Sequence, residues 1–320
     1  DYDSEAAIVG ETLSYNWGPD LQKPVYSYMK GDITKAYSDK VEEYQRSFVF
    51  FNFEDETYPA ALIVFDAIRS SSPTFKKTWL LQTEEEPEID GNTTVVTRDT
   101  IDYTGRIVNQ TLMPATGVII NKIGEDFDGI NTYWVNGTKY EMKPKSETAE
   151  VGNWRVEISP KKAEKQSYFL NVLQIGDNSE YITPLQAKLV EETDVYVGVE
   201  IKGHVAYLRK DGLSKGKTFT INPGKSDAER FFAITGLAEG KWTVYDENGK
   251  QIAQEYAYKM HDSISFKAKG DKFTLKYTPV TGLVAPDYSV YGLATDDEKG
   301  IDVIIDGCYE TFREEWIYKD

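Results

Sequence analysis

Cysteine and histidine are scarce in this chain of 320 residues. The single cysteine, Cys308, excludes an intrachain disulfide, so the fold does not depend on an oxidising compartment. The two histidines, His204 and His261, have no second histidine or cysteine near them at the spacing of a zinc site. We therefore expect no metal or other cofactor to be held by this chain alone.

Long apolar runs are also missing. None approaches the roughly twenty residues that a membrane-spanning helix needs, so we expect no membrane span.

Cys308, between Gly307 and Tyr309, is interpreted as a packed or incidental thiol rather than a nucleophile. The sequence predicts no catalytic residue in this chain.

Basic charge is the third shortage. The chain has 36 Lys and Arg against 53 Asp and Glu, a net charge of −17. This balance argues against nucleic acid as a partner and against a broad surface for polyanionic glycans or anionic lipid. Two small basic clusters stand out, Lys76–Lys77 and the group Lys161, Lys162 and Lys165. A solvated face is the simplest interpretation of both.

Aromatic and β-branched residues dominate what is present, with 22 Tyr, 14 Phe and 6 Trp. Three apolar runs of strand length occur at Ser47–Phe53, Ala60–Ile68 and Thr78–Gln82. The first two are apolar on both alternating faces, which predicts strands at the centre of a sheet that is covered on both sides. We expect an all-β fold with a large antiparallel two-sheet sandwich of the supersandwich type.

A smaller C-terminal β-sandwich is expected after the large one. Beyond Pro184 and Glu191–Glu192 the strands become shorter and the hairpins more regular. We place the large sandwich at residues 1–187, the smaller one at 188–280, and a tail without an assigned structure at 281–320. Within the first part, Tyr133–Tyr140 carries an Asn-Gly pair between two aromatic-bearing arms and predicts a hairpin.

Several motifs of the first part follow one another in an order that resembles a known family. They are Gly31–Tyr37, Phe65–Asp66, Ser72–Lys77 (SPTFKK), Trp79–Gln82, Glu86–Pro87, Thr111–Pro114, Gly152–Pro160 and Phe169–Leu173. Together they look like the C-terminal β-sandwich region of the heparinase II/III-like polysaccharide lyases. The small sandwich also fits the small C-terminal β-domain of those enzymes.

The resemblance implies that this chain is only one part of a larger enzyme. The family joins an N-terminal α/α toroid to the β region and cleaves acidic, uronate-containing polysaccharide by β-elimination. Its catalytic groups and a His/Asp/His zinc site lie on the toroid and at the start of the sandwich, upstream of this chain. This chain would be a non-catalytic portion, inactive alone, that buttresses the absent toroid and walls the substrate cleft. A single cysteine suits a secreted or periplasmic bacterial protein.

Four residues are candidates for substrate binding: Tyr37, Arg46, Lys77 and Trp134. The resemblance places Tyr37 near the cleft between toroid and sandwich. Arg46 and Lys77 offer cations to a uronate or a sulfate, and Trp134 offers a ring for sugar stacking. The alternative interpretations are an interdomain hydrogen bond for Tyr37, structural ion pairs for the cations and simple packing for Trp134.

Two other functions remain open at this point. The strong acidity and the unmatched tail after Pro279 are compatible with a free-standing carbohydrate-binding or cell-surface interaction module. A structural array protein of a bacterial envelope is the third hypothesis. The gene sequence upstream of Asp1 discriminates between the first two, because a toroid is a large helical domain of its own.

Overall fold

The computed structural model describes residues 10–100, 104–124, 152–177, 183–212 and 215–286, together with the backbone at 132–135, 138–141, 294–296 and 300–302. The described part is built from strands, with one 3-10 turn at Thr34–Ala36 (η1). The all-β prediction is therefore confirmed. Within these residues no helix is long and apolar enough to cross a membrane.

An eight-stranded antiparallel sheet, here called the large sheet, forms the centre of the first part. In spatial order its strands are β1 (Glu11–Gly18), β2 (Tyr26–Asp32), β3 (Val41–Asn52), β4 (Ala60–Ser70), β13 (Gln166–Gly176), β8 (Thr104–Met113), β7 (Thr93–Asp99) and β6 (Glu88–Asp90). A smaller covering sheet contains β5 (Trp79–Thr83), β12 (Trp154–Pro160) and β9 (Val118–Ile123).

Two further sheets make up the second part. The middle sheet holds β14 (Lys188–Glu192), β15 (Tyr196–Ile201), β16 (His204–Arg209), β18 (Arg230–Ile234) and β21 (Ile264–Ala268). The end sheet holds β17 (Phe219–Ile221), β22 (Phe273–Thr278), β19 (Gly240–Tyr245) and β20 (Gln251–Ala257). The β16–β18 pair is parallel, whereas the other pairs in these two sheets are antiparallel.

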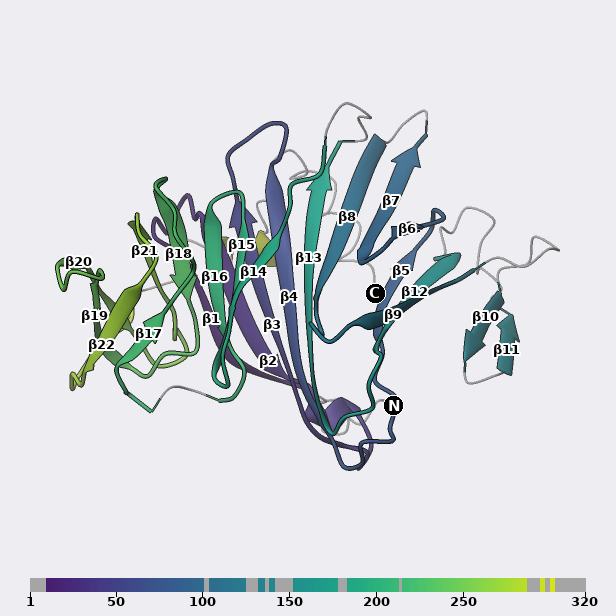
Figure 1. Cartoon of the computed structure of the whole chain (residues 1–320), viewed down its shortest axis with the longest axis horizontal. Coiled ribbons are helices and arrows are strands. Elements are labelled where there is room, and N and C mark those ends of the chain that lie inside the picture. The colour runs from purple at the N-terminus through teal and green to yellow at the C-terminus, as the bar shows by residue number, and fades with distance from the viewer. Residues whose placement is uncertain are drawn as a thin grey trace.

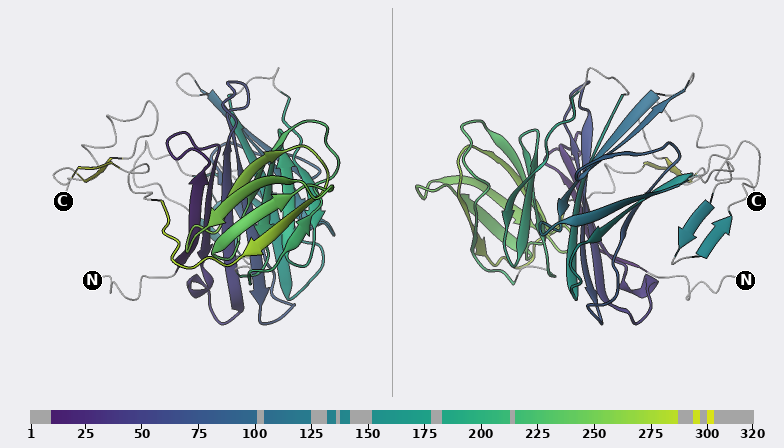
Figure 2. Two further views of the ribbon diagram at one scale, coloured as in Figure 1. Left: turned by 90° about the vertical axis from the view of Figure 1, so that its left-hand side faces the viewer. Right: turned by 45° about the vertical axis from the view of Figure 1, so that its right-hand side comes forward.

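Three hydrophobic cores join the four sheets into a stack (Figures 1 and 2). One core lies between the end and middle sheets and includes the fully buried Trp242. The next lies between the middle and large sheets and contains Phe51 and Phe231. The third lies between the large and covering sheets, around Tyr44 and Trp79. The middle and end sheets together form the small sandwich. It shares a hydrophobic core with the large sheet and therefore packs directly against it.

The middle sheet is buried on both faces because it lies between two others. Along β15, Val197, Val199 and Ile201 face the large sheet, whereas Tyr196 faces the end sheet. Gly198 lies on the Tyr196 side, and a Cβ there would stand 2.8 Å from the Tyr207 ring. Tyr207 lies opposite Gly198 on the neighbouring strand β16. A side chain at position 198 would collide with this ring, so the packing of Tyr207 over β15 requires glycine.

The large sheet departs from the prediction of a sheet covered on both sides. On the face toward the middle sheet, Val49 and Phe51 are fully buried. On the opposite face, Phe50 is 38% exposed and Met29 is 45% exposed. The covering sheet reaches only the part of this face around Tyr44 and Phe169. The prediction was wrong for the rest, because an apolar residue in a strand does not specify which sheet will cover it.

Polar contacts tie the small sandwich to the edge of the large sheet. The Ser14 hydroxyl lies 2.6 Å from a carboxylate oxygen of Asp262, and the Asn16 amide donates to the Ser263 carbonyl at 3.0 Å. His261 bonds through Nδ1 to the Tyr15 carbonyl at 2.9 Å. His204 packs its ring against Phe51 at 5.2 Å between centroids. Both histidines of the chain thus stabilise the boundary between its two parts.

Two predictions concern segments that are described only in part. The expected hairpin at Tyr133–Tyr140 is confirmed by β10 (Thr132–Val135) and β11 (Thr138–Glu141), where Val135 pairs with Thr138. Its Asn136–Gly137 turn lies outside the described residues. Most of the tail at 281–320 also lies outside them, apart from residues 281–286 and the short pair β23 (Ala294–Asp296) and β24 (Gly300–Asp302).

Candidate functional site

Two loops meet at one end of the large sheet, and the first of them is the β4–β5 loop. Pro73 occupies the second position of a turn that closes with the Phe75 amide donating to the Ser72 carbonyl at 3.3 Å. Proline favours this position because its fixed φ suits the turn, and the hydroxyls of Ser72 and Thr74 lie 2.8 Å apart across it. The turn places Lys76 and Lys77 next to the loop that joins β12 to β13.

The second loop joins β12 to β13. At its start, the Lys161 amide donates to the Gly117 carbonyl at 3.1 Å, and at its end the Lys165 carbonyl accepts from Ser70 at 2.9 Å. Gly117 has a φ of 108°, and a Cβ there would stand 3.0 Å from the Lys161 side chain. The left-handed backbone conformation therefore favours glycine, and the Lys161 side chain passes close over it.

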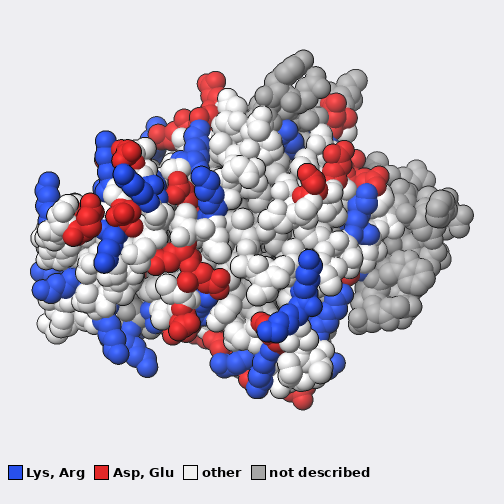
Figure 3. Space-filling view, in the orientation of Figure 1, with Lys and Arg blue, Asp and Glu red and all other residues white. Residues whose placement is uncertain are grey.

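Between the two loops lies a pocket of about 190 Å³, many times the roughly 10–15 Å³ of such space that one water needs. We call it the lysine pocket, because its described lining includes Lys76, Lys77, Lys161 and Lys162. Figure 3 shows basic side chains gathered at the lower edge of the molecule. The two basic clusters, interpreted from sequence as separate solvated faces, converge on one recess.

The four lysines differ in their partners. Lys77 is half-buried and donates to the Glu164 carbonyl, and burial lowers its pKa while Glu164 opposes that shift. Lys162 lies 2.9 Å from the Glu164 carboxylate, and Lys76 lies 3.6 Å from Glu157. Among the described residues, the Lys161 ammonium group has no hydrogen-bond or ion-pair partner. Three of the four lysines are exposed, and the half-buried Lys77 is the exception.

Arg46 and Tyr37 lie together beside Tyr44. Arg46 forms a bidentate pair with Asp66, at 2.6 and 2.9 Å, and donates to the Tyr44 hydroxyl at 2.9 Å. Asp66 is fully buried, so the pair has the geometry of the structural alternative proposed for Arg46. Tyr37 is 50% exposed and packs on the Tyr44 ring at 5.2 Å. Substrate binding by these two residues stays a prediction.

The Tyr37 loop and the lysine pocket are connected. The Ser71 amide donates to the Lys40 carbonyl at 3.0 Å, and the Lys40 ammonium lies 5.5 Å from the centre of the Phe75 ring. Tyr37, Lys77 and their neighbours thus belong to adjoining loops at the same end of the large sheet. Trp134 lies on β10, and its side chain is outside the described residues.

Sequence reasoning missed that Lys161 and Lys162 join Lys77. The signal was long-range register: β4 and β13 pair antiparallel with Arg69 opposite Gln166, so their loops leave the sheet at the same end.

One stretch of the chain has the Gly-x-Ser-x-Gly pattern that carries the nucleophilic serine in some hydrolases. It is Gly212–Gly216, which reads Gly-Leu-Ser-Lys-Gly. It lies between strands β16 and β17, not in the strand-to-helix turn that exposes a nucleophilic serine.

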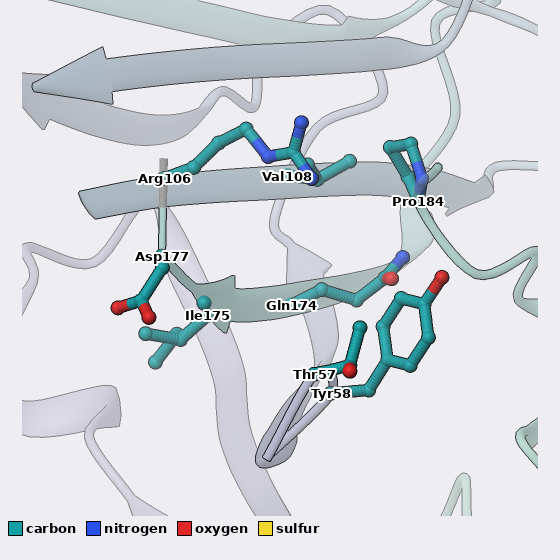
Figure 4. A pocket seen from close by; sticks show the side chains of 9 residues that line it. Thr57, Tyr58, Arg106, Val108, Gln174, Ile175, Asp177 and Pro184 are labelled. Atoms are coloured by element: carbon teal, nitrogen blue, oxygen red, sulfur yellow. The ribbon is translucent and has the colours of Figure 1, made fainter. Parts of the chain in front are cut away.

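A second recess, of about 20 Å³, lies where the connection between the two parts crosses the large sheet. The Gln174 amide exchanges hydrogen bonds with the backbone of Leu185 at 2.7 and 2.8 Å, and the Tyr58 hydroxyl donates to the Thr183 carbonyl at 2.8 Å. Figure 4 shows Tyr58 and Gln174 directed toward Pro184. The recess has room for about one water and anchors the connection.

Metal ligands are not gathered anywhere in the described part of the chain. Within it, no group of three His, Cys, Asp or Glu side chains is placed to hold a metal ion. The expectation that zinc belongs to an upstream part stays a prediction.

Comparison with known proteins identifies the second part. Residues 189–277 match the family model of the heparinase II C-terminal domain. No match was found among curated proteins. Among solved structures 22 chains match, one of them described as the crystal structure of heparinase III. It is 14% identical, the match covers 62% of this chain and 27% of that chain, and the TM-score is 0.39.

The chain therefore carries a heparinase II/III-like C-terminal region in its middle and end sheets. Residues 189–277 thus form a polysaccharide lyase-related β domain. The matched part of this chain spans 27% of the heparinase III chain. The motifs between Gly31 and Leu173 lie before the range that the family model matches.

Proposed function

We propose that this chain is the non-catalytic C-terminal β portion of a polysaccharide lyase that cleaves acidic, uronate-containing polysaccharide by β-elimination. It walls the substrate cleft and buttresses an N-terminal α/α toroid. The match of residues 189–277 to the heparinase II C-terminal domain is the observation that carries the proposal. A secreted or periplasmic bacterial location is part of it.

The use of the histidines supports a non-catalytic role. β-Elimination needs a base for the acidified C5 proton and an acid for the leaving oxygen, tasks that suit histidine or tyrosine. His204 is packed among phenylalanine rings, and burial lowers its pKa. His261 is 7% exposed and bonded to the Tyr15 carbonyl. Both side chains are committed to the contact between the two parts of the chain.

The end of the large sheet supports a role as a cleft wall. The lysine pocket offers cations, and the half-exposed ring of Tyr37 offers a surface for sugar stacking on the adjoining loop. Both features lie away from the small sandwich, which packs on the face of the large sheet that carries Phe51.

The uncovered part of the large sheet supports docking of another domain. Met29, Phe50 and Ile175 are 45%, 38% and 47% exposed on the face directed away from the small sandwich. Apolar side chains gathered on one sheet face are typical of a surface that a further domain covers. In this proposal the toroid is that domain.

A cleavage assay on the isolated chain tests the proposal. The chain is incubated with heparin, heparan sulfate, alginate and hyaluronan, and unsaturated product is followed by ultraviolet absorbance. We expect binding without turnover. Robust turnover by the isolated chain would contradict the non-catalytic role. The gene sequence upstream of Asp1 provides an independent check, since a signal peptide directly before Asp1 would favour a free-standing module.

A further inference from the structure

We infer that the lysine pocket binds the sulfate ester groups of a glycan, not its uronate carboxylates. The inference rests on the proposed function, because it assumes that an acidic polysaccharide passes this end of the large sheet. It adds the chemical group that the site selects.

The kind of cation is the first argument. All the basic side chains in the described lining of the pocket are lysines. A planar carboxylate is matched best by the fork of an arginine, as Asp66 is matched by Arg46 elsewhere in this chain. Lysine ammonium groups are compact point charges, and several of them can approach one anion from different directions. This arrangement suits the three terminal oxygens of a tetrahedral sulfate.

The origin of the cations is the second argument. Lys76 and Lys77 come from the β4–β5 loop, whereas Lys161 and Lys162 come from the β12–β13 loop. The loops are fixed by backbone hydrogen bonds to Ser72, Gly117 and Ser70. Four ammonium groups are thus held around one recess by two independent anchors, and the nearest acidic partners, Glu157 and Glu164, neutralise only part of them.

The distance that the anionic group projects from the sugar ring is the third argument. A ring carboxylate is attached directly to a carbon of the sugar ring, so it stays at the level of the chain. A sulfate ester stands away from the ring on a bridging oxygen and reaches further. The pocket lies between two loops and has a volume of about 190 Å³, which leaves room for a group that projects from the sugar ring. A sulfate ester is also a permanent anion over the whole physiological pH range.

The test compares two double variants that remove the same number of charges. Lys76→Gln/Lys161→Gln changes the pocket at two exposed lysines and leaves the half-buried Lys77 in place. Lys225→Gln/Lys269→Gln changes a pocket of about 310 Å³ in the small sandwich, which also contains Asp227. Binding is measured by calorimetry with a heparin oligosaccharide, with the same oligosaccharide after complete desulfation and N-acetylation, and with inorganic sulfate. Circular dichroism melting checks that each variant folds.

We expect the wild type to bind the sulfated oligosaccharide at least about tenfold more tightly than the desulfated one. The pocket variant should lose about tenfold in affinity for the sulfated form only, and the small-sandwich variant should match the wild type. Inorganic sulfate should bind more weakly than the oligosaccharide, because it lacks the sugar contacts.

Other outcomes separate this inference from the proposed function. Equal binding of both oligosaccharides, weakened equally by the pocket variant, would assign the pocket to carboxylates and leave the polysaccharide role standing. Equal weakening by both double variants would reduce the effect to net charge. Inorganic sulfate bound as tightly as the oligosaccharide would remove the glycan as the source. Absence of any oligosaccharide binding would overturn the inference together with the cleft-wall proposal.

Discussion

The two faces of the large sheet both carry apolar residues, but they differ in what packs against them. Toward the small sandwich, the face is sealed by a continuous core that includes Phe51, Ile63 and Phe231. On the other side, the covering sheet reaches only part of the face, and Phe50 and Met29 remain exposed. The sealed face stabilises the fold, whereas the open face and the loops at its end are the surface available to other molecules.

The largest expected effect comes from adjacent residues of β3 that point to opposite faces. Phe51→Ala should lower the free energy of unfolding by about 4 kcal/mol, because a fully buried ring leaves a cavity between two sheets. Phe50→Ala should cost less than about 1 kcal/mol, because this ring is already 38% exposed. Urea unfolding of both variants measures the difference. Similar losses would mean that the outer face is sealed as well.

The ion pair between Arg46 and Asp66 gives the next largest effect. Arg46→Met should cost about 3 kcal/mol, because it leaves a fully buried carboxylate without its cation. Adding Asp66→Asn should restore part of that loss, since the uncompensated charge is then gone. A double-mutant cycle by chemical denaturation measures the coupling. Additive losses would show that the two residues are not coupled, which would contradict a structural ion pair between them.

How far the sequence predicts this structure differs between its parts. Strand composition was enough for β3, β4 and β5, because β-branched and aromatic runs bounded by Asp, Pro and Ser need no tertiary information. The outer exposure of Phe50 was not predictable, because it depends on how far the covering sheet extends. The enclosure of the middle sheet on both faces was likewise not predictable, because it depends on which sheets pack against it.

The candidate site was predictable only in fragments. Lys77 was recognised as an available cation, and the Ser72–Phe75 turn that presents it follows from local sequence. Its convergence with Lys161 required the β4–β13 register, which pairs residues almost one hundred positions apart. Local patterns specify turns and strands, whereas a site built from two loops depends on how distant strands pair.

The boundary between the two parts should respond to pH. Burial lowers the pKa of His204 below its ordinary value of 6.5, so the folded state resists a proton that the unfolded chain accepts. Its contribution to stability is full above the unfolded pKa and is lost as pH falls through that value toward the folded one. His204→Phe should therefore reduce the loss of unfolding free energy that the protein shows between about pH 7 and pH 5.

Melting curves at a series of pH values provide the measurement for His204. His261, whose pKa is also lowered by burial, supplies the slope that should remain in the His204→Phe variant. An unchanged slope in that variant would show that His204 titrates alike in both states.

The smallest expected effect concerns Tyr37 on the outer side. Tyr37→Ala should change the unfolding free energy by no more than about 0.5 kcal/mol, because the ring is 50% exposed. It should weaken polysaccharide binding about threefold if the ring stacks on a sugar. Tyr256→Ala, on the 38% exposed tyrosine of the end sheet, is the matched control. Equal affinities for wild type and both variants would leave Tyr37 as a packing residue.

Lysine footprinting tests most directly whether this protein binds polysaccharide at the end of the large sheet that carries the lysine pocket. The folded chain is acetylated with and without a sulfated polysaccharide, and the modified sites are read by mass spectrometry. We predict that Lys76, Lys77, Lys161 and Lys162 become protected, while Lys225 and Lys269 of the small sandwich react as before. Protection confined to the small-sandwich lysines, or none at the lysine pocket, would contradict the account.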